Sequence, residues 1–366
     1  MGQIIRYLEP EEKEKARTLW SQAFFEDSEE FDQYYFTEKI KDNQILVKEE
    51  DGAIISMVHL NPYKIRLGTF CAQINYIVGV ATDDKRRHQG HMRDLLSKML
   101  QDGWEKGEPF TFLMPADRAI YEPFGFRFIF DKPQNQLKSR ISAGCGAERQ
   151  RENLRIEEYM AGALLGNRKL IKEIAGFMET WLSERFQVYA VRDWSYVKNL
   201  LTELASEDGR IELFYEGSQL KGIRADWGWE EKEQRLLYVP DDWMEKRSDP
   251  KPAIMARIVN MKEFLQLFSL KPDTKQDTEV LLEIEDPLIS HNNGLWRWNL
   301  TQNGAECEKL LQKPEKEPDL KCLADQLMQW LMGYEESEKI FLKNCPGLLW
   351  QKQINIFQGI FLDEEV

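Results

Sequence analysis

The sequence predicts a mixed α/β (α+β) protein of three domains, and three observations lead to this prediction. The chain has 366 residues, more than one ordinary domain holds. Strand-like and helix-like patterns alternate along it, and one order of strand, helix and glycine-turned strand pair occurs twice. A strand also leads through a basic, glycine-containing loop into a helix. We expect domains over residues 1–134, 135–251 and 252–366.

The first domain reads as an α/β unit. A short strand at residues 4–7 precedes a helix that begins at Pro10, a residue that suits the first helical position. Residues 44–60 then read as two strands that are joined by an Asp51–Gly52 turn. Further strands, the basic loop with its helix, and a buried strand at residues 109–116 complete the order of a sheet with its connecting helices.

The stretch from Asn75 to Leu96 organises this domain. Ile77, Val78 and Val80 form a short apolar run with β-branched residues, which predicts a buried strand. A cluster of basic residues follows. After Gly90 the apolar residues return at helical spacing, so we expect a helix there.

Strand, basic loop and helix N-terminus together predict an anion-binding site. The first helical amides have no intrahelical partner, and the helix dipole favours negative charge beside them. Gly90 lets the backbone approach a phosphate closely, and Arg86 and Arg87 would add charge-assisted hydrogen bonds. The alternative is a loop with a solvated basic cluster, but the flanking strand and helix favour the anion site.

Tyr121 is a candidate catalytic residue. It opens the segment Y-E-P-F-G-F, in which Pro123 and Gly125 end a short helix and start the last strand. A phenol with a pKa of about 10 is neutral at pH 7 and can donate a proton to a departing group. The alternative is a core tyrosine with a satisfied hydroxyl, and the nearby anion site favours the catalytic role.

The acidic and aromatic segment from Ala23 to Phe36 permits two interpretations. It could be an amphipathic helix that buries its aromatic side chains. It could also form the wall of a pocket for a polyamine, in which rings stack and carboxylates meet ammonium groups. The substrate contacts that we expect under the second interpretation are Phe24, Glu26, Asp27 and Tyr35.

The second and third domains lack a basic glycine loop. After a polar junction, residues 159–184 read as helical, and the strand, helix and strand-pair order of the first domain then recurs. The third domain reads as a strand that passes into a helix, two strands with Trp296 and Trp298 on one face, in the core or at an interface, and helices at residues 319–333 and 335–343. The second domain therefore looks like a repeat of the first without cofactor binding.

The pattern V-x-V-A-T…R-x-x-G-x-M resembles the pyrophosphate loop of the GNAT superfamily of acetyl-CoA-dependent N-acetyltransferases. Met92 stands where the family commonly has a small residue, and Asp84 stands where it often has a proline. The resemblance implies that backbone groups of this strand hold the pantetheine arm of acetyl-CoA like an added strand. The expected cofactor contacts are Val78, Gly79, Val80, Arg86, Arg87, His88, Gln89, Gly90, His91, Met92 and Arg93.

The whole chain is similar to the Eis (enhanced intracellular survival) type of N-acetyltransferase: an active GNAT domain, a degenerate one and a sterol-carrier-protein-like domain. This resemblance implies acetylation of amines, aminoglycosides included, and homo-oligomers up to hexamers. It also implies that Tyr121 is the general acid and that the C-terminal carboxylate, here Val366, is the general base. A free α-carboxylate has a pKa of about 3.5, so it would need desolvation or a water relay to serve as that base.

The composition restricts the classes of ligand and partner that we expect for this protein. The net charge of −14 disfavours nucleic acid and would attract cationic small molecules. No segment predicts a membrane span or a signal peptide, and five scattered cysteines suit reduced thiols in the cytoplasm. The four histidines are too dispersed to predict a metal site.

We therefore expect an acetyl-CoA-dependent N-acetyltransferase that modifies an amine of a cationic small molecule, such as an aminoglycoside-like compound or a polyamine. Two alternatives are a lysine acetyltransferase that acts on proteins or peptides, and a non-catalytic protein that binds an apolar ligand in its sterol-carrier-like domain.

Overall fold

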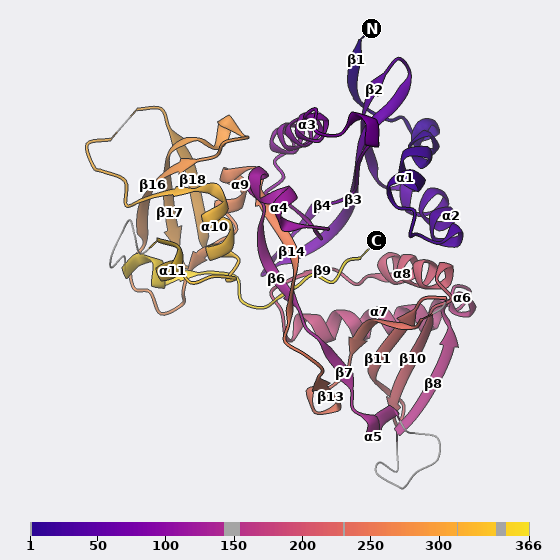
Figure 1. The fold of residues 1–366 in the computed structure, drawn as a ribbon. Helices are drawn as coiled ribbons and strands as arrows, with labels where there is room; N and C mark the ends of the chain where they lie inside the picture. Colours follow the sequence, from indigo (N-terminus) through magenta and orange to yellow (C-terminus); the bar gives the residue numbers. More distant parts are fainter. Residues whose placement is uncertain (1, 143–153, 230, 313, 342–348, 366) are drawn as a thin grey trace.

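The computed structural model describes residues 2–142, 154–229, 231–312, 314–341 and 349–365. It is a mixed α/β protein, which confirms the predicted fold class. Figure 1 shows the first domain at the upper right and centre, the second domain with its own sheet below it, and the third domain to the left. The C-terminus returns to the middle of the molecule, beside helix α8 (Trp194–Ser206). Over the described residues, no helix is both long and apolar enough to cross a membrane.

The first domain is built on a long, mostly antiparallel sheet. Its strands are β1 (Gln3–Tyr7), β2 (Gln44–Glu50), β3 (Ala53–Leu67), β4 (Phe70–Thr82), β5 (Phe110–Leu113) and β6 (Arg127–Lys132). Its helices are a 3₁₀ helix (Pro10–Ala16), α1 (Arg17–Ala23), α2 (Glu29–Thr37), α3 (His91–Glu105) and α4 (Arg118–Tyr121). The expected turn at Asp51–Gly52 joins β2 to β3, and both residues have the positive φ angles that such tight turns need.

Helices cover both faces of this sheet because the strands alternate their apolar side chains. On β2, Ile45 and Val47 face α1 and α2, whereas Leu46 between them faces α3. In the segment from Ala23 to Phe36, for which an amphipathic helix was one of two interpretations, α2 begins at Glu29, and Ser28 caps it by accepting a hydrogen bond from the Phe31 amide.

A strand from far along the chain completes this sheet. Strand β14 (Lys251–Ile258) lies between β5 and β6 and pairs with both, so the strand order is β1-β2-β3-β4-β5-β14-β6. The expected boundary at residue 252 therefore falls inside a strand of the first domain's sheet. The pairing brings the start of the third domain directly onto the first.

The second domain repeats the strand order of the first. Its elements are β7 (Asn135–Leu137), α5 (Ser139–Ser142), β8 (Leu154–Met160), α6 (Ala161–Leu164), α7 (Arg168–Ser183), β9 (Val188–Ala190), α8, β10 (Arg210–Glu216), β11 (Gln219–Trp227), β12 (Glu233–Tyr238) and β13 (Met244–Lys246). The sheet order β8-β10-β11-β12, with helices between its first two strands, parallels β1-β2-β3-β4. Strand β9 leaves this sheet and pairs with β3.

The prediction of one helix over residues 159–184 was wrong at its start. Leu154–Met160 is the edge strand β8, which pairs with β10 at seven successive positions, and helices begin only at Ala161. The side chains of β8 are only partly buried, so the sequence there lacks the continuous apolar run of a central strand.

The third domain has a four-stranded sheet covered by short helices. Its elements are α9 (Met261–Leu265), β15 (Ser269–Leu270), β16 (Thr278–Glu285), β17 (Gly294–Thr301), β18 (Gly304–Leu310), β19 (Leu320–Leu323), α10 (Ala324–Leu331), α11 (Ser337–Phe341), β20 (Ile354–Asn355) and, at the chain end, β21 (Ile360–Phe361). Trp296 and Trp298 are buried in its core, and each indole N–H donates to a backbone carbonyl. The predicted helix over residues 319–333 was wrong at its start, because β19 pairs in parallel with β16 before α10 begins.

A buried ion pair fixes the third domain to the first. Arg257 of β14 lies 2.5 Å from an Asp286 carboxylate oxygen, and both side chains are almost fully buried. The Asp286 carboxylate also accepts hydrogen bonds of 3.0 Å from the backbone N–H groups of Leu288 and Ile289.

We predict that Asp286→Ala lowers the free energy of unfolding by about 3–5 kcal/mol, because it leaves the Arg257 charge buried without a partner. Urea denaturation followed by tryptophan fluorescence measures the change. The control is Glu308→Ala, which removes an exposed partner of Arg297 and should cost less than about 1 kcal/mol. Equal effects of the two substitutions would contradict this account.

Candidate active site

Strands β4 and β5 separate to form a gap in the sheet. They run in parallel, and over the described residues they pair at one position, Tyr76 opposite Phe112. Beyond it, β4 continues for six residues against β3 alone. The backbone edge of β4 around Val78 and Val80, both partly exposed, is therefore open to an extended ligand that pairs with it.

A glycine shapes β4 beside this gap. Gly79 has φ +59°, a left-handed conformation that glycine adopts readily. A Cβ at this position would collide with the ring of Trp20 on α1, so the close approach of helix and strand also requires glycine. The register between β3 and β4 shifts at this point, because Met57 pairs with Ala81 and His59 pairs with Val78.

The basic loop ends at the N-terminus of α3, as the sequence predicted. Gly90 caps this 15-residue helix at φ +84°, with nothing within 4 Å of an added Cβ. The free first amides of the helix and the open space around Gly90 suit a phosphate group.

The side chains of the loop are mostly exposed, but those of Arg86, Arg87 and Gln89 contact other groups of the protein. Arg86 pairs with Glu50, and Arg87 lies 2.6 Å from Asp84. His88 and Gln89 are exposed, and His88 has a positive φ angle. A bound phosphate would therefore compete with carboxylates for the two arginines.

The first turn of α3 presents backbone rather than side chains to the loop. His91 is buried, so only its amide is available to a ligand of the loop. Met92 is partly buried and packs against the apolar cluster below α3. Arg93 is exposed, and its guanidinium lies 5.1 Å from the centre of the Phe124 ring.

Tyr121 lies on the α3 side of the gap. It ends α4 and is buried in the same apolar cluster as Ile77 and Leu113, the residues that follow the last paired position on β4 and β5. Burial raises the pKa of Tyr121 to about 12, so the phenol stays protonated at neutral pH. A proton donor is thereby placed close to the point where the strands part.

The α1–α2 segment borders an open hollow of about 790 Å³. Phe24 and Asp27 line it, and Trp20 donates a hydrogen bond of 3.0 Å to the Asp27 carboxylate. Glu26 directly precedes Asp27 in the sequence, and its side chain is exposed. Tyr35 is fully buried instead, stacked on Trp20 at 4.2 Å, and does not line the hollow.

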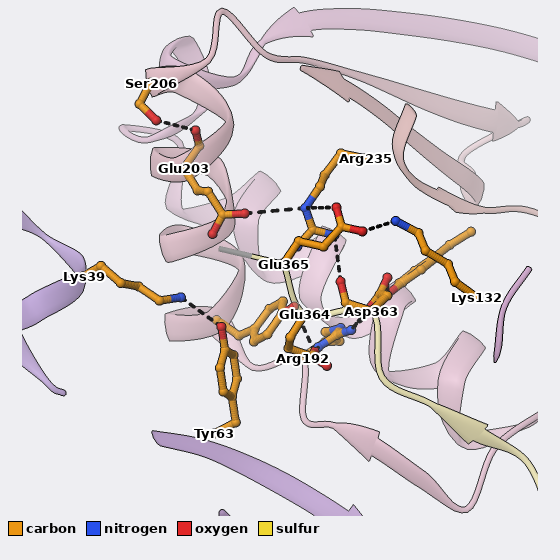
Figure 2. A network of polar contacts seen from close by, with 12 residues as sticks. Lys39, Tyr63, Lys132, Arg192, Glu203, Ser206, Arg235, Asp363, Glu364 and Glu365 are labelled. Atoms are coloured by element: carbon orange, nitrogen blue, oxygen red, sulfur yellow. Dashed lines mark hydrogen bonds and ion pairs between the residues drawn. The ribbon is translucent and has the colours of Figure 1, made fainter. Parts of the chain in front are cut away.

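The acidic end of the chain is docked between the first and second domains (Figure 2). Strand β21 pairs in parallel with β9, and the Phe361 ring contacts Phe186 at 4.9 Å between ring centres. Fully buried Arg192 lies 2.6 Å from Glu364 and also pairs with Asp363.

Two more cations hold this tail. Arg235 donates a hydrogen bond of 2.9 Å to the Asp363 carbonyl, and Lys132 at the end of β6 pairs with Glu365. Burial and nearby charged groups, Glu364 and Glu365 among them, raise the pKa of Tyr76. The tail therefore reaches the side of the gap opposite Tyr121. Val366, the expected base, lies outside the described residues.

A second cavity, of about 370 Å³, lies between the first and second domains on the tail side of the gap. Its walls come from α2, the 3₁₀ turn after it, β3, α8 and β12. The Tyr63 ring on its wall lies 6.0 Å from the Tyr76 ring and 6.4 Å from the Phe112 ring, between centres. The cavity thus adjoins the pair at which β4 and β5 part.

Sequence reasoning missed the residues that hold the tail and line this cavity. Arg192 and Arg235 lie more than 120 positions before the tail residues they bind, and no local periodicity marks them. The run of three carboxylates at residues 363–365 was a usable signal, because buried carboxylates need cationic partners. In the described part of the chain, no three His, Cys, Asp or Glu side chains are grouped to hold a metal ion.

Comparisons with known proteins identify two of the domains. Residues 4–129 match the family described as acetyltransferase (GNAT) domain, and residues 261–341 match the family described as sterol carrier protein domain. No curated protein matches the chain.

Three solved structures have the same fold over nearly the whole chain. A probable N-acyltransferase from Enterococcus faecalis is 16% identical, with a TM-score of 0.75 over 98% of this chain and 94% of that chain. A GCN5-related N-acetyltransferase from Anabaena variabilis is 15% identical, with a TM-score of 0.73 over 98% and 99%. Eis1 from Mycobacterium abscessus is 12% identical, with a TM-score of 0.69 over 100% of both chains.

The buried His59 lies under α1 and α2, and it leads to a prediction of how the stability of the folded protein depends on pH. Its Nδ1 shares a hydrogen bond of 3.0 Å with the Tyr35 hydroxyl, and burial lowers its pKa to about 3. The folded protein keeps His59 neutral while the unfolded chain binds a proton below about pH 6.5, so stability falls as the pH is lowered through that range.

We expect the parent protein to lose roughly 2 kcal/mol more unfolding free energy than His59→Gln between pH 7 and pH 5. Urea denaturation at the two pH values measures both. Parallel losses in parent and variant would show that His59 does not titrate in this way.

Proposed function

We propose that this protein transfers an acetyl group from acetyl-CoA to an amine of a cationic small molecule. Residues 4–129 match the GNAT acetyltransferase domain, so the protein is an acyltransferase. The observation that carries the proposal is the parting of β4 and β5 beside a glycine-capped helix N-terminus. These features are suited to a pantetheine arm and a pyrophosphate, respectively.

The residues around the loop have distinct roles in this proposal. Val78, Gly79 and Val80 offer backbone groups to the pantetheine arm. The amides at Gly90, His91 and Met92 hold the pyrophosphate, while the side chains of Arg86, Arg87, His88, Gln89 and Arg93 surround it. Acetyl-CoA supplies the acetyl group as a thioester.

The chemistry divides between the two sides of the gap. The acceptor nitrogen forms a bond to the acetyl carbon while the carbon–sulfur bond breaks, and Tyr121 gives its proton to the departing sulfur. On the other side, the carboxylate of Val366 takes a proton from the attacking amine. Support for this role is the docking of residues 360–365, which leads the chain end toward Tyr76.

Acidic and aromatic side chains favour a cationic acceptor. Phe24 and Asp27 line the outer hollow, with Glu26 beside them, and the net charge of −14 attracts cations from solution. Tyr35 would support this wall from beneath, through its stack with Trp20. The family resemblance favours a homo-oligomer, and the scattered cysteines favour the cytoplasm.

Release of CoA from acetyl-CoA tests the function. The purified protein is offered aminoglycosides, polyamines and lysine peptides, with release of free thiol as the readout. Amine-dependent release is expected, and Arg87→Ala should weaken acetyl-CoA binding because a phosphate contact is lost. Binding of a co-purified lipid without any CoA release would favour a non-catalytic protein instead.

Tyr121→Phe should retain acetyl-CoA affinity and lose most of the turnover, by about 10²-fold or more, because the sulfur no longer receives its proton. Steady-state kinetics and a binding titration separate the two effects. Tyr121 is not the acid if the variant turns over at the parent rate.

Deleting Val366 should slow acetylation strongly, while deletion leaves Asp363 and Glu364 in place on Arg192. Extending the chain by one glycine should have a similar effect, because it moves the terminal carboxylate. The control is Lys132→Met, which removes one contact of Glu365 and preserves the terminus. Full activity of both altered termini would exclude the terminal carboxylate as the base.

A further inference from the structure

Lys39 stands at the wall of the interdomain cavity without a counter-ion. Its ammonium donates a hydrogen bond of 2.9 Å to the Tyr63 hydroxyl. Among the residues that the structure describes, no carboxylate oxygen lies within 4 Å of its Nζ. Figure 2 shows Lys39 and Tyr63 on one side and the acidic tail with its arginines on the other.

The nearby carboxylates already have other partners. Glu364 pairs with Arg192, and Glu203 lies 3.5 Å from Arg235. Burial lowers the pKa of Lys39, although the more distant Glu203 and Glu364 carboxylates act to raise it. Lys39 is partly buried at the wall of this cavity, and a bound anion would supply the close charged partner that its ammonium lacks.

Two more donors without partners belong to residues that line the same cavity. The Tyr34 hydroxyl and the Asn61 amide nitrogen are buried, and neither has a hydrogen-bond partner in the described part of the chain. Buried polar groups are ordinarily hydrogen-bonded, so orphaned donors around a cavity indicate a ligand that accepts from them. With Lys39 they form one cationic donor and two neutral donors on adjoining elements.

The opposite polarity is also present. Acidic side chains line the same cavity, Glu38 and Asp42 from the first domain and Glu203 from the second, whose carboxylate lies 3.5 Å from Arg235. Donors on one side and carboxylates on another match a ligand that carries both an anion and an ammonium group. Glu203, Glu38 and Asp42 on the walls would repel a doubly charged phosphate, so a carboxylate is the better match.

We propose that this cavity binds an amine that also carries a carboxylate, as a free amino acid does, with the carboxylate held by Lys39, Tyr34 and Asn61. This inference rests on the proposed function and narrows its acceptor. The ligand carboxylate supplies the counter-ion that Lys39 lacks. The cavity adjoins the Tyr76–Phe112 pair, so the amine of the bound molecule is directed to the place where the strands part.

Matched amines that differ only in the carboxylate test the proposal. Isothermal titration of the full chain compares ornithine with putrescine, and lysine with cadaverine, in the absence of acetyl-CoA. We expect the amino acids to bind at least about tenfold more tightly, the effect of one charge-assisted hydrogen-bonded contact. Equal or tighter binding of the diamines would overturn the proposal.

Variants identify the residue responsible. Lys39→Met should abolish the preference, and Lys39→Arg should retain most of it because the charge remains. Lys64→Met is the matched control, since Lys64 is an exposed lysine on the same cavity, and it should keep the full preference. A preference that persists in a folded Lys39→Met protein would overturn the role of Lys39.

The two proposals fail separately. Carboxylate-dependent binding without CoA release for any amine would refute the acetyl transfer and leave the cavity assignment standing. CoA release with polyamines at the same efficiency as with amino acids would refute the cavity assignment and leave the transfer standing.

Discussion

The buried contact between Arg192 and the acidic chain end is the interaction on which the packing of the first and second domains around that end depends. Arg192 and Glu364 are both withdrawn from water, so each charge is tolerable only while the other is present. Asp363 and the Tyr238 hydroxyl, 3.1 Å apart, share the same cluster. The last residues of the chain are thereby held against the second domain, on the face of the sheet opposite Tyr121. A chain end that would otherwise fray becomes part of a defined wall.

Two strand pairings extend this constraint to the whole protein. Strand β14 enters the first domain's sheet between β5 and β6, and β9 pairs with β3 on one side and with β21 on the other. One continuous apolar core therefore contains Phe112 of the first domain, Leu201 of the second and Trp298 of the third. The three domains cannot move as independent bodies without breaking backbone pairing, which keeps both sides of the β4–β5 gap in register.

Local patterns predicted much of the fold. The hairpin over residues 44–60, the start of α3 at His91 and the buried Trp296 and Trp298 all follow from alternation, a capping glycine and apolar periodicity. The predictions that were wrong concern segments whose structure depends on backbone pairing with a strand elsewhere in the chain. Residues 154–160 and 320–323 are strands because β10 and β16 offer them backbone partners, and a short, partly buried strand has little periodicity of its own. The position of Tyr35, buried under α1 rather than at the hollow, likewise depended on packing.

By itself the sequence determined the mixed α/β class, the acetyltransferase domain and the basic loop before α3, because these depend on residues that are contiguous in the chain. The β4–β5 gap, the docked tail and the Lys39 cavity were decided only by the tertiary structure. Their residues are separated by up to 233 positions, as Lys132 and Glu365 are, and the ion pairs and strand pairings that unite them exist only after the domains have packed. The loop could therefore be located from sequence, whereas the surroundings of the acceptor could not.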